Sequence, residues 1–233
     1  MIVELEPVGR ESIARVQLTN DSTKDIPYEI RMMRGIISPQ GELELVPADE
    51  DFLVFPAQAL VEQKSQQVFR IQYVSDAALD QSQTYYMSIQ QVPVAYQPGV
   101  SQVQVVVNYN VLINVVPDGS EPLPAVRSYS SVERKVSEES LADDGTIATT
   151  EQTVKGLEVD LANDGNRFFL AGMADWKITG KTVDGLDFER EYEGEDMSKV
   201  IGVGVVAPGR NRIFLIPMEE ELMPETVSIS ISF

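Results

Sequence analysis

Apolar and polar residues alternate along most of the chain. In the segment 13–19, Ala14, Val16 and Leu18 alternate with more polar neighbours, and an Asn-Asp pair follows. A period of two is typical of β-strands. Short strands between turn residues indicate an antiparallel sandwich rather than βαβ units. Similar alternation, bounded by Asn, Asp, Gly or Pro, recurs at 28–33, 43–55, 68–73 and 85–92.

No long stretch has a strong helical period of 3.6 residues. The segments 132–141 and 189–200 come nearest to it, but they are too polar to anchor a helical core. We therefore predict an all-β fold with little helix.

The strand pattern occurs twice along the chain, which predicts two domains. The sequence GLEVDLANDGNRFFLAG at 156–172 repeats the order of IARVQLTNDSTKDIPYEI at 13–30: a strand, an Asn-Asp turn and a second strand. Between the two series, the proline-rich stretch PDGSEPLP is typical of an interdomain linker. The predicted division is a first domain at 1–117, a linker at 118–124 and a second domain at 125–233.

One piece of the second domain, 130–155, is unusually polar. The dipeptide Asp144-Gly145 within it is a good signal for a two-residue hairpin turn. We predict that this piece forms a protruding hairpin or a mobile loop.

The segment 101–117, SQVQVVVNYNVLINVVP, contains no charged residue, and the uncharged run extends back to Gln81. Charged residues normally protect an edge strand against pairing with other chains. The odd positions from 103 to 115 are all apolar, whereas the even positions are mixed. This alternation has two explanations. The segment is either an ordinary core strand or an exposed strand that pairs with a partner.

Composition excludes several classes of partner. The 233 residues include 37 acidic and 18 basic ones, which gives a formal net charge of −19. Nucleic acids and anionic membrane surfaces are therefore poor partners. No segment approaches the roughly 18–20 apolar residues that span a bilayer. The N-terminal sequence MIVELEPVGR is not a signal peptide, so we expect either a cytoplasmic chain or one with a mature or trimmed N-terminus.

The absence of histidine and cysteine limits the possible chemistry. It excludes a Ser-His-Asp triad, a cysteine nucleophile and a thiolate zinc site. A carboxylate-pair hydrolase and a calcium site remain open on composition alone. The acidic runs 49–51 and 219–221 lack the spaced pattern of a calcium loop, and solvated loops are the better interpretation. We predict no catalytic residue, no cofactor and no metal site.

Several pieces of the chain resemble a known family in their order and spacing. They are VQLTND, IPYEIR, FLVFPAQALVEQKSQQVFRIQY and a strand at Tyr85-Tyr86 that runs into QQVPV. Through these pieces the segment 13–93 resembles the N-terminal domain of periplasmic pilus-assembly chaperones of the chaperone–usher pathway. The resemblance implies a non-enzymatic, all-β protein of the periplasm. It also implies two immunoglobulin-like antiparallel β-sandwich domains set at an angle around a cleft.

In that family, the chaperone lends a strand to a pilus subunit whose own immunoglobulin-like fold lacks its final strand. The corresponding donor strand here is 101–116, with 103–107 as the donating end and 109–115 as part of the domain's own sheet. The implied partners are a pilus subunit and an outer-membrane usher, and the exposed edge at 101–109 suggests self-association. The residues expected to pair with the client strand are Val103, Val105, Val107 and Tyr109, and possible polar contacts in the cleft are Asn108 and Asn110.

The chain departs from the family at its basic residues. The family anchors the client's C-terminal carboxylate with an arginine on the first strand and a lysine on the last strand of the N-domain. Here these positions fall at Val3–Leu5 and at Asn110 or Leu112. Arg70 matches the family's arginine at the domain interface, but the usual acidic partner falls at Ser82. The alternative is a two-domain immunoglobulin-like extracellular adhesin or binding module, in which 103–115 is simply a core strand.

Overall fold

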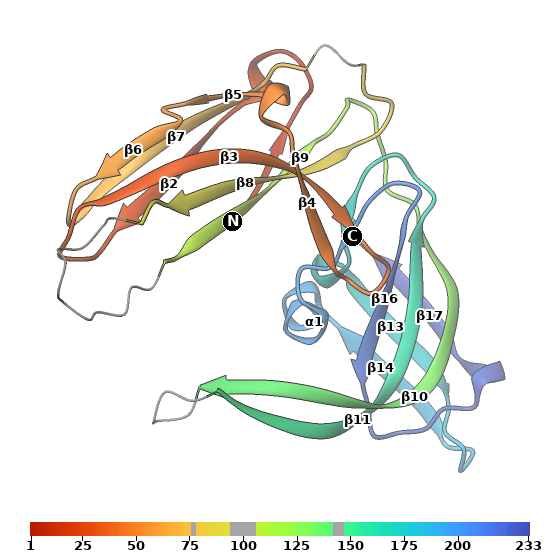
Figure 1. Ribbon diagram of the computed structural model, residues 1–233. Coiled ribbons are helices and arrows are strands. Elements are labelled where there is room, and N and C mark those ends of the chain that lie inside the picture. Colours follow the sequence, from red (N-terminus) through yellow and green to blue (C-terminus); the bar gives the residue numbers. More distant parts are fainter. Residues whose placement is uncertain (76–77, 94–105, 142–146) are drawn as a thin grey trace. The chain divides into compact units, whose positions relative to one another are not determined.

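The alternating segments form β-strands in the structure, a computed structural model that describes residues 1–75, 78–93, 106–141 and 147–233. Within 136–141 and 147–152 only the backbone is described. The chain divides into two compact units (Figure 1). The first unit comprises Met1–Ile37, Leu43–Glu121 and Asn166–Phe168, and the second comprises Ser38–Glu42, Pro122–Gly165 and Phe169–Phe233.

The prediction of an all-β fold is confirmed, because strands make up most of both units. Four short 3₁₀ turns are present in the described residues: η1 (Arg10–Ser12), η2 (Asp49–Asp51), η3 (Ala171–Met173) and η4 (Pro224–Thr226). The strands of the first unit are β1 (Ile2–Leu5), β2 (Ile13–Asn20), β3 (Ile26–Ile37), β4 (Leu43–Pro47), β5 (Phe52–Phe55), β6 (Gln58–Val61), β7 (Ser65–Tyr73), β8 (Gln83–Gln91) and β9 (Asn108–Val115). The elements of the second unit are β10 (Pro124–Leu141), β11 (Ile147–Asn163), β12 (Phe169–Leu170), β13 (Asp175–Lys181), β14 (Asp187–Tyr192), α1 (Gly194–Ile201), β15 (Val205–Val206), β16 (Asn211–Pro217) and β17 (Ser228–Ser232).

The first unit encloses one apolar core between two sheets. One sheet has the strand order β1-β9-β8-β3-β4, with β6 also paired to β3, and the other has the order β2-β7-β5. All described pairs are antiparallel except β1 and β9, which are parallel. Val16 and Leu18 of β2 are buried in this core, whereas Arg15 and Gln17 are exposed. The alternation therefore assigns the inner face of β2 correctly.

Aromatic rings and a polar network lie together in the first core, beneath β8. The ring centroid of Phe52 lies 4.9 Å from that of Tyr85 and 5.3 Å from that of Tyr73, both in edge-to-face geometry. The buried Tyr85 hydroxyl lies 3.1 Å from Asp51 Oδ2, and Arg34 Nη2 donates a 2.8 Å hydrogen bond to the same oxygen. Burial raises the pKa of the Tyr85 phenol above its ordinary value. This network holds β8 in position, and β8 is the strand that pairs with β9 along its whole length.

The repeated Asn-Asp turns have one structural basis. Asn20 and Asn163 are both buried, and the Oδ1 atom of each accepts a hydrogen bond from the backbone N–H two residues further on, at Ser22 and Gly165. Each Nδ2 group donates to a carbonyl oxygen of another strand, β6 in the first unit and β15 in the second. Because an asparagine side chain can replace a backbone group in a turn, the same dipeptide ends a strand in both units.

The second unit contains the sheets β10-β11-β16 and β14-β13-β17 and a short pair, β12-β15. The hairpin β10–β11 pairs from Pro124 opposite Asn163 to Leu141 opposite Ile147. Since β16 pairs with β11 only from Gly156 to Ala162, the outer part of the hairpin extends beyond the sheet (Figure 1). The hairpin predicted at 130–155 is therefore confirmed, and its expected turn at 144–145 lies outside the described residues.

Helix α1 corrects the prediction for the segment 189–200. Residues 194–201 form the helix, whereas 189–192 belong to β14. Met197 is the one fully buried residue of α1, while Asp196 and Lys199 form an exposed ion pair of 2.7 Å. Val200 and Ile201, three and four residues after Met197, also pack against the second core and form a short apolar face with it. At eight residues, the helix is too short for its 3.6-residue period to stand out in the sequence. No helix in the described residues has the length and apolar character needed to cross a membrane.

We expect Asp51→Ala to destabilise the first unit by about 1–3 kcal/mol, because it removes an acceptor shared by Tyr85 and Arg34. Thermal unfolding followed by circular dichroism measures the change. The exposed Glu44 on β4, whose side chain makes no hydrogen bond or ion pair among the described residues, provides the control. Glu44→Ala should stay within about 0.5 kcal/mol of the wild type. Equal stability of the two variants would contradict a structural role for the network.

Candidate functional site

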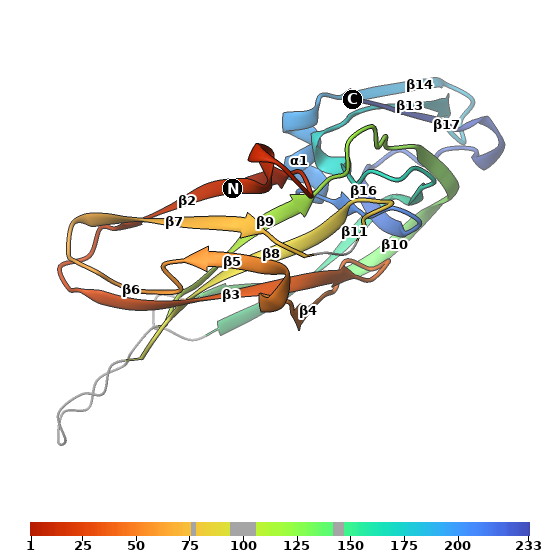
Figure 2. The ribbon, with the colours of Figure 1, turned by 90° about the horizontal axis from the view of Figure 1, so that it is seen from above.

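Strand β9 is paired along its whole length on one side but only partly on the other. Its partner β8 lies opposite all of it, from Gln90 beside Asn108 to Gln83 beside Val115 (Figure 2). On the outer side, β1 covers only Leu112 to Val115. Among the described residues, no strand pairs with the outer edge of Asn108–Val111. This open edge presents backbone donors and acceptors that another strand can bind.

One face of β9 is an apolar stripe that continues beyond the core. Ile113 and Val115 are fully buried, and Val111 is only 7% exposed. Towards the N-terminal end of the same face, Tyr109 is 44% exposed and Val107 is 40% exposed. Side chains at every second position share a face, so the stripe passes from buried to accessible between Val111 and Tyr109.

Where the backbone ladder between β8 and β9 ends, side-chain oxygens accept hydrogen bonds from the next backbone N–H groups. The Gln91 N–H donates to Asn108 Oδ1 at 3.2 Å, and the Val107 N–H donates to Gln91 Oε1 at 3.2 Å. Nearby, burial raises the pKa of Tyr28, and the neighbouring Tyr109 phenol raises it further. These contacts hold the first residues of the open edge close to the sheet. The role of Gln91 could not be predicted from the sequence, because its neighbours on β8 include further glutamines and other polar residues.

The other face of β9 carries the asparagines. Asn110 is exposed and lies opposite Ser88, while Leu112 and Asn114 are buried. The Thr84 hydroxyl donates a 2.9 Å hydrogen bond to Asn114 Oδ1. The polar residues of this face that are accessible to a partner are thus Asn108 and Asn110.

The predicted site residues fall into three groups in the structure. Val107, Asn108, Tyr109 and Asn110 lie together at the open edge. Val103 and Val105 lie outside the described residues. Arg70 lies apart from them on β7, in the other sheet of the first unit, where its side chain is exposed.

Arg70 belongs to an exposed surface that the sequence analysis did not identify. It lies directly opposite Arg15 of β2 on one side and Phe55 of β5 on the other. On the same face, Phe55 is 75% exposed and Leu53 is 62% exposed, and Val68 is also exposed. We name Arg15, Leu53, Phe55, Val68 and Arg70 the β5–β7 patch. The apolar run FLVF is the sequence signal that could have indicated it, because such a run on an edge strand exposes alternate residues.

The two basic anchor positions of the family are filled differently here. Leu112 is buried on β9 and lies opposite Ile2, and β1 carries no cation. One cation does contact β1: Arg167, from a distant part of the sequence, forms an ion pair of 2.5 Å with Glu4 of β1. The sequence could not indicate this contact, because the two residues are far apart along the chain.

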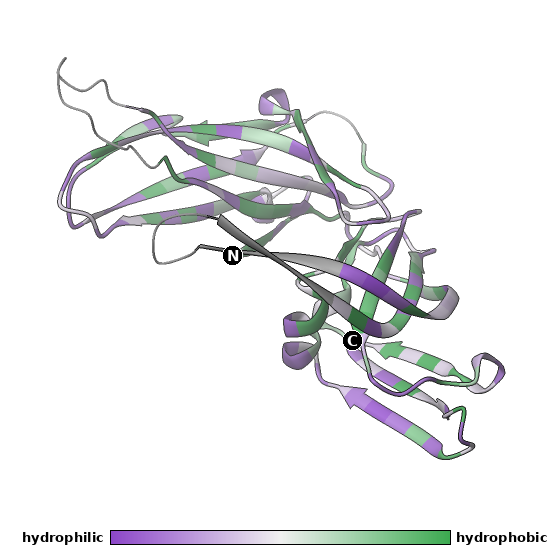
Figure 3. Ribbon diagram, turned by 60° about the horizontal axis from the view of Figure 1, so that its bottom comes forward, coloured by the Kyte–Doolittle hydropathy of each residue, from purple (hydrophilic) through white to green (hydrophobic). Residues whose placement is uncertain are grey.

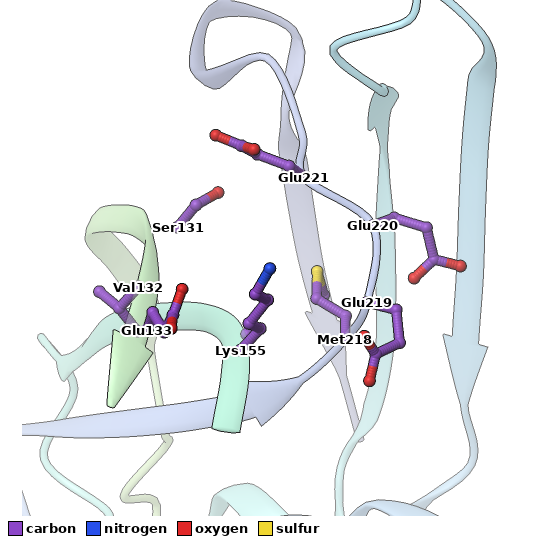
Figure 4. Close-up of a pocket in the computed structure, with 9 residues that line it drawn as sticks. Ser131, Val132, Glu133, Lys155, Met218, Glu219, Glu220 and Glu221 are labelled. Carbon is purple, nitrogen blue, oxygen red and sulfur yellow. The ribbon is translucent and has the colours of Figure 1, made fainter. Parts of the chain in front are cut away.

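The second unit has a shallow pocket of about 200 Å³ (Figure 4). Its charged lining residues are Glu133, Lys155 and Glu219–Glu221. Lys155 is directed into the pocket, and Glu220 points away from it towards an ion pair of 3.0 Å with Arg190. Within the described residues, no three potential ligands among His, Cys, Asp and Glu come together to hold a metal ion. The pocket carries no functional assignment.

Comparison with known proteins agrees with this architecture. Three solved fimbrial chaperone structures resemble the whole chain at 11–12% identity, which shows a shared fold. For the class 5 fimbriae chaperone CfaA the identity is 12% and the TM-score 0.53, over 100% of this chain and 95% of that one. For the YadV chaperone the values are 11% and 0.54, over 99% and 88% of the two chains. A chain from a chaperone–tip adhesin complex of CFA/I fimbriae biogenesis gives 12% and 0.54, over 99% and 95%.

The sequence itself matches one family. No curated protein sequence matches the chain significantly. Residues 8–121 match the family described as pili and flagellar-assembly chaperone, PapD N-terminal domain. This segment includes β9 and its partner strand β8. Through residues 8–121, just under half of the chain, the protein is similar to the N-terminal domain of pilus-assembly chaperones.

Proposed function

We propose that this protein is a periplasmic chaperone that binds an incompletely folded pilus subunit and completes its fold by donating the strand that leads into β9. The observation that carries the proposal is the open edge of Asn108–Val111, with an apolar stripe that becomes accessible at Val107 and Tyr109. The donated segment would comprise Val103, Val105, Val107 and Tyr109. Its main chain would extend the subunit's sheet, and its alternate side chains would fill the groove.

Burial of the stripe offsets much of the cost of association. A valine-sized side chain contributes about 1.5–3 kcal/mol on burial, so three or four of them contribute about 5–12 kcal/mol against an association cost of about 4–15 kcal/mol. The main-chain hydrogen bonds of the added strand contribute further affinity. A charged residue on the stripe would lose that advantage, because a buried unpaired charge is strongly unfavourable. The absence of any charge from Gln81 to Pro117 supports this use of the strand.

The client would be anchored without the family's arginine and lysine pair. Asn108 and Asn110 are accessible on the face opposite the stripe, and their amides can donate and accept hydrogen bonds. We propose that strand pairing together with these two side chains sets the position of the client. Self-association through 101–109 stays a prediction, since most of that segment lies outside the described residues.

Delivery of the subunit to an outer-membrane usher requires a second surface that stays accessible while β9 is occupied. The β5–β7 patch meets this requirement, because it lies on the outer face of the other sheet of the first unit. An exposed phenylalanine beside two arginines has the composition of an interface hot spot. Within the described residues, neither Arg15 nor Arg70 forms an ion pair, so both are available to an acidic partner. We propose that the usher binds here.

Donation predicts that Val107→Asp and Tyr109→Asp abolish capture of the pilus subunit but keep the fold. Each places a carboxylate in the client groove, and the loss should exceed tenfold. Because both positions are about half exposed in the free protein, the melting temperature should stay within about 3 °C. The measurement is co-purification of the subunit after co-expression, beside thermal unfolding of each variant. The same loss is expected for Val105→Asp.

Val111→Asp is the matched control, because it places the same charge on the same face but within the core. It should unfold the first unit. If Val107→Asp still captures the subunit, or unfolds as badly as Val111→Asp, the strand is an ordinary core strand. The binding-module alternative would then be favoured.

The usher surface predicts a different pattern. Phe55→Ser and Arg70→Glu should weaken binding to the usher by about tenfold or more and leave subunit capture unchanged. Binding of the purified chaperone–subunit complex to the usher measures the effect. Val46→Ser, on the exposed surface of β4 in the other sheet, is the control and should have no effect. Unchanged usher binding by both patch variants would contradict this assignment without affecting the donor-strand proposal.

A further inference from the structure

Strand β17 forms an open edge of the second unit. It is the last strand of the sheet β14-β13-β17 and pairs with β13 from Ser232 opposite Asp175 to Ser228 opposite Thr179 (Figure 2). In the part of the chain that the structure describes, no strand other than β13 pairs with it. The outer backbone groups of β17 are therefore available to another strand.

The residues of β17 do not protect this edge. From Thr226 to Phe233 the sequence TVSISISF has no charge, in a chain whose net charge is −19. The serines of β17 are exposed, whereas Ile229 and Ile231 are partly buried against the second core. Figure 3 shows the strand that ends at the C-terminus in alternating apolar and pale segments. The opposite edge strand of this sheet, β14, reads DFEREY and carries a charge at four of its six positions.

The sequence of β17 is complementary to itself. When two copies pair antiparallel about Ser230, Ile229 of each copy lies opposite Ile231 of the other. Ser228 likewise lies opposite Ser232, and Phe233, which is 65% exposed, falls opposite Val227. A two-fold axis perpendicular to the sheet keeps both rows of isoleucines on the same side, so each apolar core continues into the other. Cross-strand pairs of β-branched residues stabilise such a contact.

The distribution of charge also favours pairing of two copies along β17. Two copies with a net charge of −19 each repel one another over most of their surfaces. The contact along β17 brings together only uncharged residues, so the repulsion is least there. An antiparallel pair of identical edge strands also stops at a dimer, because the two-fold contact pairs both open strands and leaves no further β17 edge.

We propose that β17 pairs with β17 of a second copy, antiparallel about Ser230, to form one continuous sheet β14-β13-β17-β17-β13-β14. The contact uses the second unit alone. It is independent of the proposed function and does not involve the open edge of β9.

Cysteine cross-linking tests the register, because the chain contains no other thiol. A single cysteine at 230 faces its own copy across the two-fold axis. There the Cβ atoms of a cross-strand pair lie about 4.5–5.5 Å apart, close to the distance that a disulfide requires. Ser230→Cys should form a disulfide-linked dimer with oxidised glutathione. Ser228→Cys is the matched control and should not, because two such residues are about 13 Å apart in this register.

The solution mass provides the second measurement. Light scattering of the full chain should give twice 25.8 kDa at about 100 µM. Ser230→Lys places two like charges at the axis and should raise the dissociation constant of the dimer by about tenfold or more, with an unchanged melting temperature. A monomeric wild type would overturn the proposal. It would also be overturned by a dimer that Ser230→Lys leaves intact, or by equal cross-linking of the two cysteine variants.

Discussion

The backbone hydrogen bonds of β9 decide which part of the first unit is open to a partner. Because β8 covers this strand completely and β1 covers only its C-terminal half, the strand changes from core element to open edge within its own length. An edge strand carries a full set of donors and acceptors that must bond to water or to another strand. The change coincides with the change in side-chain burial between Val111 and Tyr109. The same strand therefore completes the first unit at one end and is available to a partner at the other.

The distribution of charge agrees with this division. The chain is strongly acidic, yet the segment that includes β8 and β9 has no charged residue from Gln81 to Pro117. Net charge keeps a protein soluble, and a charge on the edge itself would prevent burial in a client. Two other uncharged edges stand out, β5 in the first unit and β17 in the second. The acidic surface repels other acidic proteins. The uncharged edges are the surfaces proposed to bind partners.

Local features of the fold could be predicted from the sequence. The burial of Val16 and Leu18, the asparagine turns and the long hairpin all follow from residues that are close together in the chain. The features that escaped prediction depend on residues far apart in sequence. The parallel pairing of β1 decides how much of β9 is open, and nothing in the sequence of either strand reveals it. The β5–β7 patch likewise exists only because β2, β7 and β5 lie side by side. Helix α1 was missed for a local reason: its eight residues are too few for the helical period of Met197, Val200 and Ile201 to stand out in the sequence.

Amide hydrogen exchange of the free protein and of its complex with a pilus subunit tests strand donation by β9. Strand donation predicts that the amides of Val107 to Val111 that point away from β8 exchange readily in the free protein. They should become strongly protected in the complex, while the amides of Leu112 to Val115 remain protected in both. Unchanged exchange at Val107 to Val111 on binding, with protection elsewhere in the first unit, would show that the subunit binds another surface and would contradict strand donation.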